Sequence, residues 1–590
     1  MYVVATAGHV DHGKSTLIRA LTGMEPDRWA EERRRGLTID LGFAWTELRP
    51  GMTVAFVDVP GHERFVPNML AGVGSVPAVL FVVAADEGWM PQSAEHLAAL
   101  HALGVRHGLC AIARSDLADP EPARRQAVAE LARTSLGEVE AVAVSASTGD
   151  GMAELRAALE RLLARLPDPE HEEPVRFWVD RSFTIRGSGT VVTGTLTAGR
   201  LRVGDELEVA SLGHTAHVRG LQSLGRPVTE APAVARVAVN LRGVERHDLR
   251  RGDALLTPER FHSSDVVDVR VHGDPVASLP RSAMLHIGSA AVSVRVRSLG
   301  ADTARLTLAH ALPLRIGDRG LLRNPGEHHV SGGVTVLDVA PPELARRGAA
   351  VTRAEVLADL DGRADEHSEL RRRGIVRQRD LQRMGVTPTI APVRDDWLVD
   401  DQLWAKLRER LPRLVAGWRR EHSLEPGPPV DVVRRALRLP ERSLVQALVA
   451  PPLAVRGGRV VHADQTADLP SPVVRAVEQL RVELTASPFD APGRDRLAEL
   501  GLGPRELAAA ERAGVLVRIA DYVVLLPGSI QDAATALGDL PQPFTVSQAR
   551  QTLGTTRRVA VPLLELLDRR GFTRRLPDDR RQVLARAARE

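Results

Sequence analysis

The sequence predicts a multidomain protein, because its character changes twice along 590 residues. Residues 1 to about 165 alternate short apolar runs with helical patterns, which predicts an α/β domain built on a parallel sheet. Residues 175–341 carry short β-rich runs broken by glycine turns, which predicts two small antiparallel β-barrels. From residue 343 the helical patterns return, and units close with a loop and a short hairpin. Helices followed by a hairpin are typical of winged-helix domains, and we expect four in tandem.

The expected domain boundaries follow from these changes. The α/β domain should occupy residues 1–170, with strands at Tyr2–Ala7, Thr53–Val57, Val79–Ala84, Gly108–Ala113 and Glu138–Val144. A polar, proline-bearing linker, Leu166–Pro174, separates it from barrels expected at 175–262 and 263–342. The winged helices are expected at 343–410, 411–468, 469–530 and 531–590. Three of them end in the hairpin sequences PPLAVRGGRVVHAD, ERAGVLVRIADYVVLLP and DRRGFTRRLPDDRRQVL.

Composition narrows the possible functions. The net charge is only +3, so a nucleic-acid site requires local clustering of basic residues. The single cysteine, Cys110, excludes an intrachain disulfide and a cysteine-based zinc cluster, which suits a reducing cytoplasm. The longest apolar run, Val76–Ala85, is too short to span a bilayer, so we expect no membrane partner. The sequence contains no coiled-coil heptad pattern or large apolar stripe that would indicate self-association, so we expect a monomer.

The stretch GHVDHGKS, residues 8–15, fits the motif G-x-x-x-x-G-K-[ST] in full. It follows a predicted strand and precedes the helical run STLIRALTG, which is the context that this phosphate-binding loop requires. The Lys14 ammonium should reach the β- and γ-phosphates, and the Ser15 hydroxyl should bind Mg²⁺. Lys14 and Lys406 are the only lysines of the chain, which argues against an incidental lysine beside a glycine turn. The predicted nucleotide-binding residues of this loop are Asp11, His12, Gly13, Lys14, Ser15 and Thr16.

Two further segments complete a phosphoryl-transfer site. In VAFVDVPGH, residues 54–62, Asp58 is expected to hold Mg²⁺ through water and the Gly61 N–H to bind the γ-phosphate. His62 stands where a residue that positions the attacking water belongs. In RRRGLTID, residues 33–40, Thr38 can bring a second hydroxyl to Mg²⁺. Each residue alone is compatible with an ordinary turn or loop, and the interpretation depends on their combination with the phosphate loop.

The base is predicted to be guanine. Asp116 of IARSD follows a strand and can accept two N–H bonds from guanine N1 and N2. Ser145 and Ala146 of SAS follow the next strand and can meet guanine O6 through backbone N–H groups. Adenine would leave a buried carboxylate unpaired, which is costly. Arg114 can stack on the purine, and we expect GTP and GDP with Mg²⁺ as cofactors.

Together GHVDHGKST, RGLTI, DVPGH and the strand-end SD and SA resemble the translational GTPases of the elongation-factor-Tu type. RGSGTVVTGTL and GDRGLLRNP resemble the second and third domains of that family, and the likeness covers roughly residues 1–341. The resemblance implies that the GTP state orders the region around Thr38 and holds an aminoacyl-tRNA. It also implies that His62 positions water on the ribosome behind a hydrophobic gate of Val10 and Leu37.

One departure from the family pattern concerns the base-binding loop. The family usually has Asn-Lys-x-Asp or Thr-Lys-x-Asp, and this chain has Ala113-Arg114-Ser115-Asp116. Ala113 lacks the side-chain hydrogen bond that braces the phosphate loop. We therefore predict weaker nucleotide binding than in a relative with Asn or Thr at that position.

The C-terminal segment is basic. Residues 541–590 hold eleven arginines against five acidic residues, a local net charge of +6 (11 − 5). The sequence predicts helix, turn at Gly554, helix and hairpin, with Arg557 and Arg558 opening the second helix where they can bind phosphates. Sparse aromatics disfavour stacking on single strands, and a folded RNA hairpin fits better. A solvated arginine surface and duplex DNA binding remain open on this evidence alone.

The combination of these domains resembles the bacterial selenocysteine-specific elongation factors, and the terminal segment resembles their last winged helix through GTTRR, AVPLLELLD and GFTRR. The likeness implies binding of an mRNA hairpin beside a UGA codon through Ser547, Arg550, Arg557, Arg558, Arg574 and Arg575. It also implies a selenocysteine pocket of Asp180, Arg181 and Arg236, with the outer pair 56 residues apart (236 − 180). Two guanidiniums bind a selenolate far better than the uncharged hydroxyl of the serine precursor. Adjacent strand residues face opposite sides, so Asp180 and Arg181 can share this pocket only near a strand end or bulge.

These observations predict a GTPase that delivers selenocysteinyl-tRNA to the ribosomal A site at UGA codons. One alternative is another tRNA-binding translational GTPase, such as one resembling the γ subunit of archaeal initiation factor 2. A second alternative is a GTP-switched winged-helix regulator that binds DNA.

Overall fold

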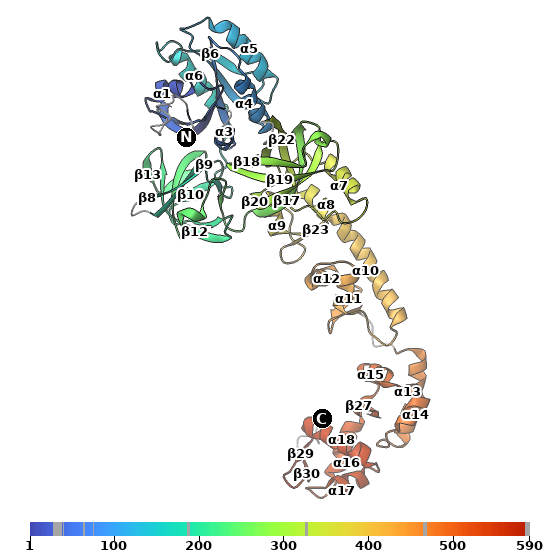
Figure 1. Cartoon of the computed structure of the whole chain (residues 1–590). Helices are drawn as coiled ribbons and strands as arrows, with labels where there is room; N and C mark the ends of the chain where they lie inside the picture. The colour runs from blue at the N-terminus through green and yellow to red at the C-terminus, as the bar shows by residue number, and fades with distance from the viewer. Residues whose placement is uncertain are drawn as a thin grey trace. The chain divides into compact units, whose positions relative to one another are not determined.

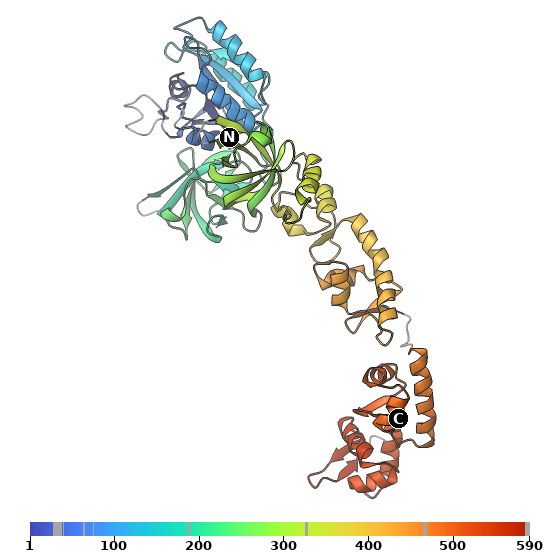
Figure 2. The same cartoon turned by 45° about the vertical axis from the view of Figure 1, so that its right-hand side comes forward.

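The computed structural model describes residues 1–26, 38, 40–62, 65–74, 76–185, 189–324, 329–463 and 469–584. Two compact units divide the chain, Met1–Ile390 and Ala391–Glu590. In both views of the first unit, the barrels drawn in green adjoin the α/β domain drawn in blue (Figures 1 and 2). The predicted gate residue Leu37 lies outside the described residues.

The described part of the first domain forms a six-stranded sheet with the order β2-β3-β1-β4-β5-β6. The strands are β1 (Tyr2–Ala7), β2 (Gly42–Arg49), β3 (Met52–Asp58), β4 (Ala78–Ala84), β5 (His107–Ala113) and β6 (Glu140–Ala143). All are parallel except β2, which pairs antiparallel with β3 at the edge. Strand β2 was not predicted, because its second half is partly exposed and lacks a continuous apolar run.

Helices cover both faces of this sheet (Figure 1): α1 (Lys14–Thr22), α3 (Val66–Val73), α4 (Pro91–Ala102), α5 (Pro120–Ala132) and α6 (Met152–Leu163). Neighbouring residues of β1 divide between two cores, because successive strand side chains point to opposite faces. Val3 packs in the core that contains Leu97 of α4, and Val4 in the core that contains Leu17 of α1. Burial on both faces explains why the parallel strands read as unbroken apolar runs.

Two antiparallel β structures follow. The first contains β7 (Arg176–Trp178), β8 (Arg181–Ile185), β9 (Gly189–Leu196), β11 (Glu206–Val209), β12 (His214–Ser223), β15 (Ala235–Arg242) and β16 (Ala254–Leu256) in one sheet. The short strand β13 (Arg226–Val228) pairs with β12 in the same sheet, and β10 (Arg200–Arg202) and β14 (Glu230–Pro232) form a separate two-stranded sheet. The second is a closed barrel of β17 (His262–Gly273), β18 (Ser282–Ile287), β19 (Ala290–Ser298), β20 (Thr303–Leu314), β21 (Arg319–Asn324) and β22 (His329–Asp338).

Helices α7 (Ala349–Ala358), α8 (Glu366–Arg373) and α9 (Gln378–Arg383), with the short strand β23 (Ile375–Arg377), belong to the first unit. A buried network of ion pairs ties them to the second barrel. Arg353 of α7 donates to Asp268 of β17 at 2.7 Å and to Asp338 of β22 at 2.6 Å. Both carboxylates are fully buried; Arg305 also pairs with Asp268, and Arg372 and Arg373 also pair with Asp338. The network fixes α7 and α8 against the barrel.

In the second unit, three helices and a two-stranded hairpin recur in that order. The first set is α10 (Asp401–Glu421), α11 (Val430–Ala436), α12 (Arg442–Leu448), β25 (Leu453–Arg456) and β26 (Arg459–His462), after strand β24 (Trp397–Val399). The second is α13 (Ser471–Ala486), α14 (Arg494–Glu499), α15 (Pro504–Arg512), β27 (Val517–Ala520) and β28 (Val523–Leu525). The third is α16 (Ser529–Gly538), α17 (Val546–Thr552), α18 (Arg557–Arg569), β29 (Thr573–Arg575) and β30 (Arg581–Val583).

The boundary expected at 410/411 falls inside helix α10. Its buried residues Trp404, Leu407, Leu411 and Val415 recur at helical spacing across that point, so one apolar stripe keeps the helix continuous. The boundary expected at 530/531 similarly falls just inside α16. The number of winged-helix domains stays a prediction. None of the helices in the described ranges is long and apolar enough to cross a membrane.

Candidate functional sites

The predicted phosphate-binding loop connects the end of β1 to the start of α1. Gly8 adopts φ 128°, and a Cβ there would approach the Val82 carbonyl oxygen to 2.1 Å, so only glycine fits. The backbone N–H groups of Gly8 and Val10 donate to His96 Nδ1 at 3.1 Å and Gln92 Oε1 at 3.3 Å. Helix α4, which carries both acceptors, therefore holds the loop from behind.

A cavity of about 790 Å³ lies in front of this loop. Of the predicted residues, it is lined by Val10, Asp11, Gly13, Lys14, Ser15, Thr16, Thr38, Gly61, Arg114, Asp116 and Ala146. The described lining does not include His12, Asp58, His62 or Ser145. His12 is fully buried, and burial lowers its pKa to about 4, so its imidazole is neutral at pH 7.

Two of the three predicted Mg²⁺ ligands, Ser15 and Thr38, lie close together. Ser15 Oγ and Thr38 Oγ1 are 2.9 Å apart. Two ligands on one edge of an octahedron with bonds of about 2.0–2.1 Å are separated by about 2.9 Å, so these hydroxyls fit the ion. Asp58 is buried at the end of β3, and its Oδ1 accepts a hydrogen bond from Thr6 Oγ1 at 2.7 Å.

Lys14 and Gly61 both line the cavity and approach each other closely. The Lys14 ammonium donates to the carbonyl oxygens of Gly8, at 3.0 Å, and His9. Burial lowers the pKa of Lys14 to about 8, and the carboxylates of Asp58 and Asp11 oppose the shift. A Cβ on Gly61 would lie 2.5 Å from Lys14 Nζ, so this glycine permits the close approach of the two segments.

The base-binding loop contacts the phosphate loop directly. Arg114 adopts φ 55°, and its Nη2 donates to the Asp11 carbonyl oxygen. Its Nη1 pairs with Asp86 Oδ2 at 3.0 Å and Glu87 Oε1 at 2.8 Å. Asp86 and Glu87 were not predicted from the sequence, although an acidic pair just beyond a buried strand is a signal for this end of the sheet. Asp116 lines the same cavity, as predicted for a base contact.

The predicted catalytic histidine lies beside the cavity. His62 is partly buried, and its ring centroid is 5.9 Å from that of Phe65. Val10, one half of the predicted gate, lines the nucleotide cavity. The catalytic role of His62 and the gate stay predictions.

The three residues of the predicted selenocysteine pocket meet at the start of β8. Asp180 lies between β7 and β8, and Arg181 opens β8, which satisfies the expected strand-end condition. Asp180 is 5% exposed and forms a two-oxygen ion pair with Arg236 of β15, with Nη2 to Oδ1 at 2.8 Å. The Phe43 ring of the first domain lies under both guanidiniums, at 3.9 Å from that of Arg236 and 5.3 Å from that of Arg181.

Further charged groups tie this cluster to the first domain. Arg181 Nη2 lies 2.9 Å from Asp40 Oδ2. Arg251 donates to Asp40 Oδ1 at 3.0 Å and, through Nε, to the Asp180 carbonyl oxygen at 3.1 Å. Three arginines thus face two aspartates, for a net charge of +1 (3 − 2). Asp40, Phe43 and Arg251 were not predicted as members of this site, because they are distant in the chain from the pocket motif.

A cavity of about 870 Å³ opens at this cluster. Its lining is Asp40, Asp180, Arg181, Ser182, Phe183, Arg246, His247, Leu249, Arg250 and Arg251. Arg236 lies behind Asp180, bonded to its carboxylate, rather than in the described lining of the cavity.

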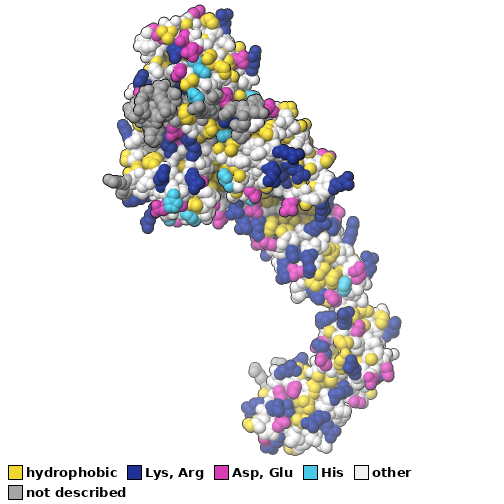
Figure 3. All heavy atoms as spheres, viewed as in Figure 1, with side chains coloured by type: hydrophobic (Ala, Val, Ile, Leu, Met, Phe, Trp, Pro, Cys, Tyr) yellow, Lys and Arg dark blue, Asp and Glu magenta, His cyan; other side chains and the backbone are white. Residues whose placement is uncertain are grey.

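The predicted RNA-binding residues divide into two groups. Ser547, Arg550 and Arg557 line one hollow of about 400 Å³ between α17, α18 and the hairpin. Arg558 instead donates to the carbonyl oxygens of Ala491 and, at 3.2 Å, Pro492 in the preceding helical set. On the hairpin, Arg574 is exposed and Arg575 pairs with Asp579 at 2.6 Å. On the face of the second unit that Figure 3 draws, acidic side chains lie among the basic ones.

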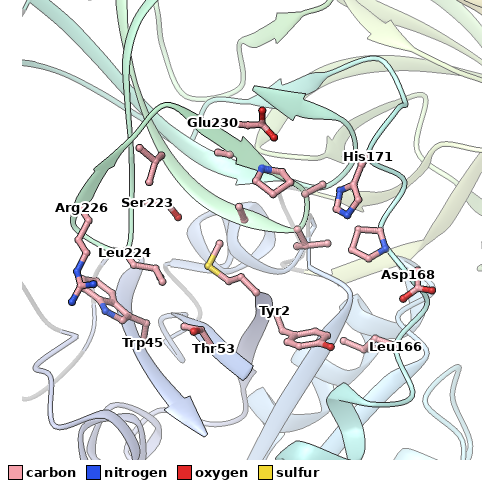
Figure 4. A pocket seen from close by; sticks show the side chains of 18 of the residues that line it. Tyr2, Trp45, Thr53, Leu166, Asp168, His171, Ser223, Leu224, Arg226 and Glu230 are labelled. Atoms are coloured by element: carbon pink, nitrogen blue, oxygen red, sulfur yellow. The ribbon is translucent and has the colours of Figure 1, made fainter. Parts of the chain in front are cut away.

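Another cavity, of about 680 Å³, lies between the first domain and the first barrel (Figure 4). Tyr2, Trp45, His171, Arg226 and Glu230 belong to its mixed lining. Tyr2 starts β1 and Gly8 follows its last residue, so this cavity and the phosphate loop lie at opposite ends of that strand.

Comparison with known proteins defines the class. Family models match for the elongation factor Tu GTP binding domain over residues 1–165 and elongation factor Tu domain 2 over residues 189–256. The "Elongation factor SelB, winged helix" model matches residues 535–582. With the phosphate loop and paired hydroxyls described above, these matches make the chain a translational GTPase that binds GTP and GDP with Mg²⁺ and hydrolyses GTP.

Whole-chain similarity identifies the branch. The chain is 33% identical to the selenocysteine-specific elongation factor of Escherichia coli (strain K12), over 98% of each chain. It is 45% identical to that of Desulfomicrobium baculatum, over 46% of this chain and 43% of the relative. The crystal structure of a bacterial selenocysteine-specific elongation factor matches with a TM-score of 0.74 and 27% identity, over 99% of both chains. The chain therefore belongs to the family of selenocysteine-specific elongation factors, as the sequence predicted.

Proposed function

We propose that this elongation factor carries selenocysteinyl-tRNA in its GTP state to the ribosomal A site at UGA codons, in the cytoplasm. We further propose that it recognises an mRNA hairpin near the codon through its last helical set and hairpin. The observation that carries the proposal is the Asp180–Arg181–Arg236 cluster around Phe43. Its net positive charge favours an anionic ligand in a partly buried setting, where charges are weakly screened.

The pocket chemistry follows from the ionisation of the ligand. A selenol loses its proton at neutral pH, whereas the serine hydroxyl of the precursor stays neutral. A selenolate beside Arg181, with Arg236 held behind Asp180, would add the negative charge that the cluster lacks. Serine would leave that charge uncompensated, and the loss of one charged contact costs about 1.5–3 kcal/mol. Asp180 holds the Arg236 guanidinium in one orientation and is proposed to act as a positioning residue.

In the nucleotide site, Ser15, Thr38 and Asp58 are the residues that would hold Mg²⁺, which neutralises charge on the phosphates. Lys14 would bind the β- and γ-phosphates, and the Gly61 N–H the γ-phosphate. His62 is proposed to orient the attacking water on the ribosome, with Val10 and Leu37 restricting its access beforehand. Asp116, Ser145 and Ala146 would select guanine.

Purified translation with a UGA-containing message tests the function. We expect this chain to support selenocysteine incorporation with GTP only when a cognate hairpin accompanies the codon. Two control messages are matched to it. In the first, base changes disrupt the stem of the hairpin, and in the second, compensating changes restore the stem. Selenocysteine incorporation that does not require this protein would contradict the proposal. So would equally efficient insertion of serine from the precursor form of the tRNA, which carries serine.

A further inference from the structure

Lysine is almost absent from this chain, and the phosphate loop accounts for only one of its two lysines. The other, Lys406, lies on α10 of the second unit, and its side chain is exposed. Further basic residues share its side of the helix, because positions three or four apart lie on one face. This basic face of α10 consists of Lys406, Arg410, Arg413 and Arg420, all of them exposed.

The basic face does not stabilise the helix that carries it. Among the described residues, none of its four cations forms an ion pair or a side-chain hydrogen bond. Other exposed helices pair their arginines, as Arg481 of α13 pairs with Glu478 at 2.6 Å. Lys406 and Arg410 are four residues apart and Arg410 and Arg413 three, and like charges at these spacings destabilise a helix. The row therefore points to a ligand rather than to the fold.

The hollow between α11 and α12 of the same helical set is neutralised from within. Arg434, Arg435 and Arg442 line it. The Asp431 carboxylate pairs with Arg434 and Arg442, and the Asp431 carbonyl oxygen accepts from Arg435 at 3.3 Å. These arginines are less available to an anionic ligand than the cations of the basic face.

We propose that the basic face of α10 binds the phosphodiester backbone of RNA, as a contact separate from that of the last helical set. From Lys406 to Arg420 the face extends over about 21 Å, at about 1.5 Å per residue. A row of cations of this length matches a linear polyanion, and lysine and arginine are the usual phosphate contacts. The inference goes beyond the proposed function, which places the RNA contacts of the second unit in its last helical set alone.

The composition of the face favours RNA over a protein partner. Protein–protein interfaces have an apolar core, often with large aromatic anchors. The large hydrophobic side chains that are exposed in the described ranges include none from α10. Glu409 and Glu421 of the same helix are also exposed, and against four cations they leave a net charge of +2 (4 − 2).

The test measures the affinity of the full-length protein for selenocysteinyl-tRNA, the cognate mRNA hairpin and intact ribosomes over a range of salt concentrations. Lys406→Gln, Arg410→Gln and Arg413→Gln combined should weaken binding to at least one of them about tenfold or more. The corresponding salt slope should fall by about 2–3, and the partner affected identifies the source of the phosphates. Thermal unfolding should stay at the wild-type midpoint or rise, because like charges are removed.

Arg408→Gln is the matched control, because Arg408 is exposed on the same helix about 160° around its axis from Arg410. It should leave the three affinities near wild type, whereas Arg410→Gln alone should lower one salt slope by about 1. Equal losses in these two variants, or unchanged affinities in the triple variant, would overturn the inference.

Two further outcomes separate the alternatives. A loss of affinity for ribosomes that isolated ribosomal RNA does not reproduce would assign the face to a protein partner and overturn the RNA contact. Insertion of serine as efficiently as selenocysteine by the wild type would instead overturn the proposed function, and the RNA contact of α10 would stand.

Discussion

Arg114 is expected to take over part of the bracing that Ala113 cannot provide. Its guanidinium joins the base-binding loop to the Asp11 carbonyl of the phosphate loop, and Asp86 and Glu87 hold it there. Replacement by methionine keeps an unbranched apolar stem and removes every donor. The phosphate loop should then lose an anchor on the side where the nucleotide binds.

The magnitude follows from exposure. The side chains of Arg114, Asp86 and Glu87 are 29%, 30% and 35% exposed, so each ion pair contributes only about 0.5 kcal/mol. The charged hydrogen bond to the Asp11 carbonyl adds about 1–2 kcal/mol. A total of about 2 kcal/mol corresponds to an increase in the GDP dissociation rate of about 30-fold.

Stopped-flow release of a fluorescent GDP measures this rate. Arg133→Met provides the control, because Arg133 pairs only with Glu130 on the surface of α5 among the contacts described. Ala113→Asn should slow GDP release, and more so in the Arg114→Met background, where the missing brace has no substitute. A dissociation rate within twofold of wild type in Arg114→Met would refute the reasoning.

Three other predictions concern pH and RNA. Burial lowers the pKa of Lys14 to about 8. The affinity for GDP should therefore be constant below pH 8 and fall about tenfold per pH unit above it. GDP dissociation constants that do not change up to about pH 9.5 would contradict this. Burial alone would raise the pKa of Asp338, but the guanidinium of Arg373 and its neighbours lower it to about 2. The ionised form of Asp338 therefore stabilises the fold at pH values above the usual pKa of 3.8. The free energy of unfolding should fall by about 2 kcal/mol as the pH falls from 3.8 to 2, and Asp338→Asn should lack this acid sensitivity in unfolding experiments. Arg557→Ala should weaken hairpin binding and reduce the salt slope by about 1, whereas Arg569→Ala on the same helix should not; equal losses would indicate general charge attraction.

The sequence predicted those parts of the site that local motifs encode. One cavity is lined by the phosphate loop, by the hydroxyls of Ser15 and Thr38, and by Asp116. These groups meet because the segments that carry them follow the carboxyl ends of parallel strands or lie against those ends. The contact of Arg114 with Asp11 was out of reach, since it joins residues 103 apart and requires a left-handed backbone at Arg114.

The pocket shows the same limit across domains. Its three predicted members meet, but Asp40, Phe43 and Arg251 come from other strands and loops, and no spacing rule relates them. The fold class followed from periodicity, whereas the edge strand β2 and the extent of helix α10 did not. Half of the edge strand β2 is polar, so it lacks the apolar run that predicts a strand. Helix α10 continues across the expected domain boundary, and no change in composition shows where it begins and ends.

The affinity of the GTP-loaded protein for charged tRNA tests the central claim most directly. Selenocysteinyl-tRNA is compared with the same tRNA carrying serine, at one stated salt concentration, in wild type, Arg236→Ala and Arg242→Ala. Arg242 is exposed on the same strand as Arg236 and controls for the loss of charge. The account predicts a strong preference for selenium that Arg236→Ala loses and Arg242→Ala keeps. Equal affinity of wild type for both tRNAs would contradict it.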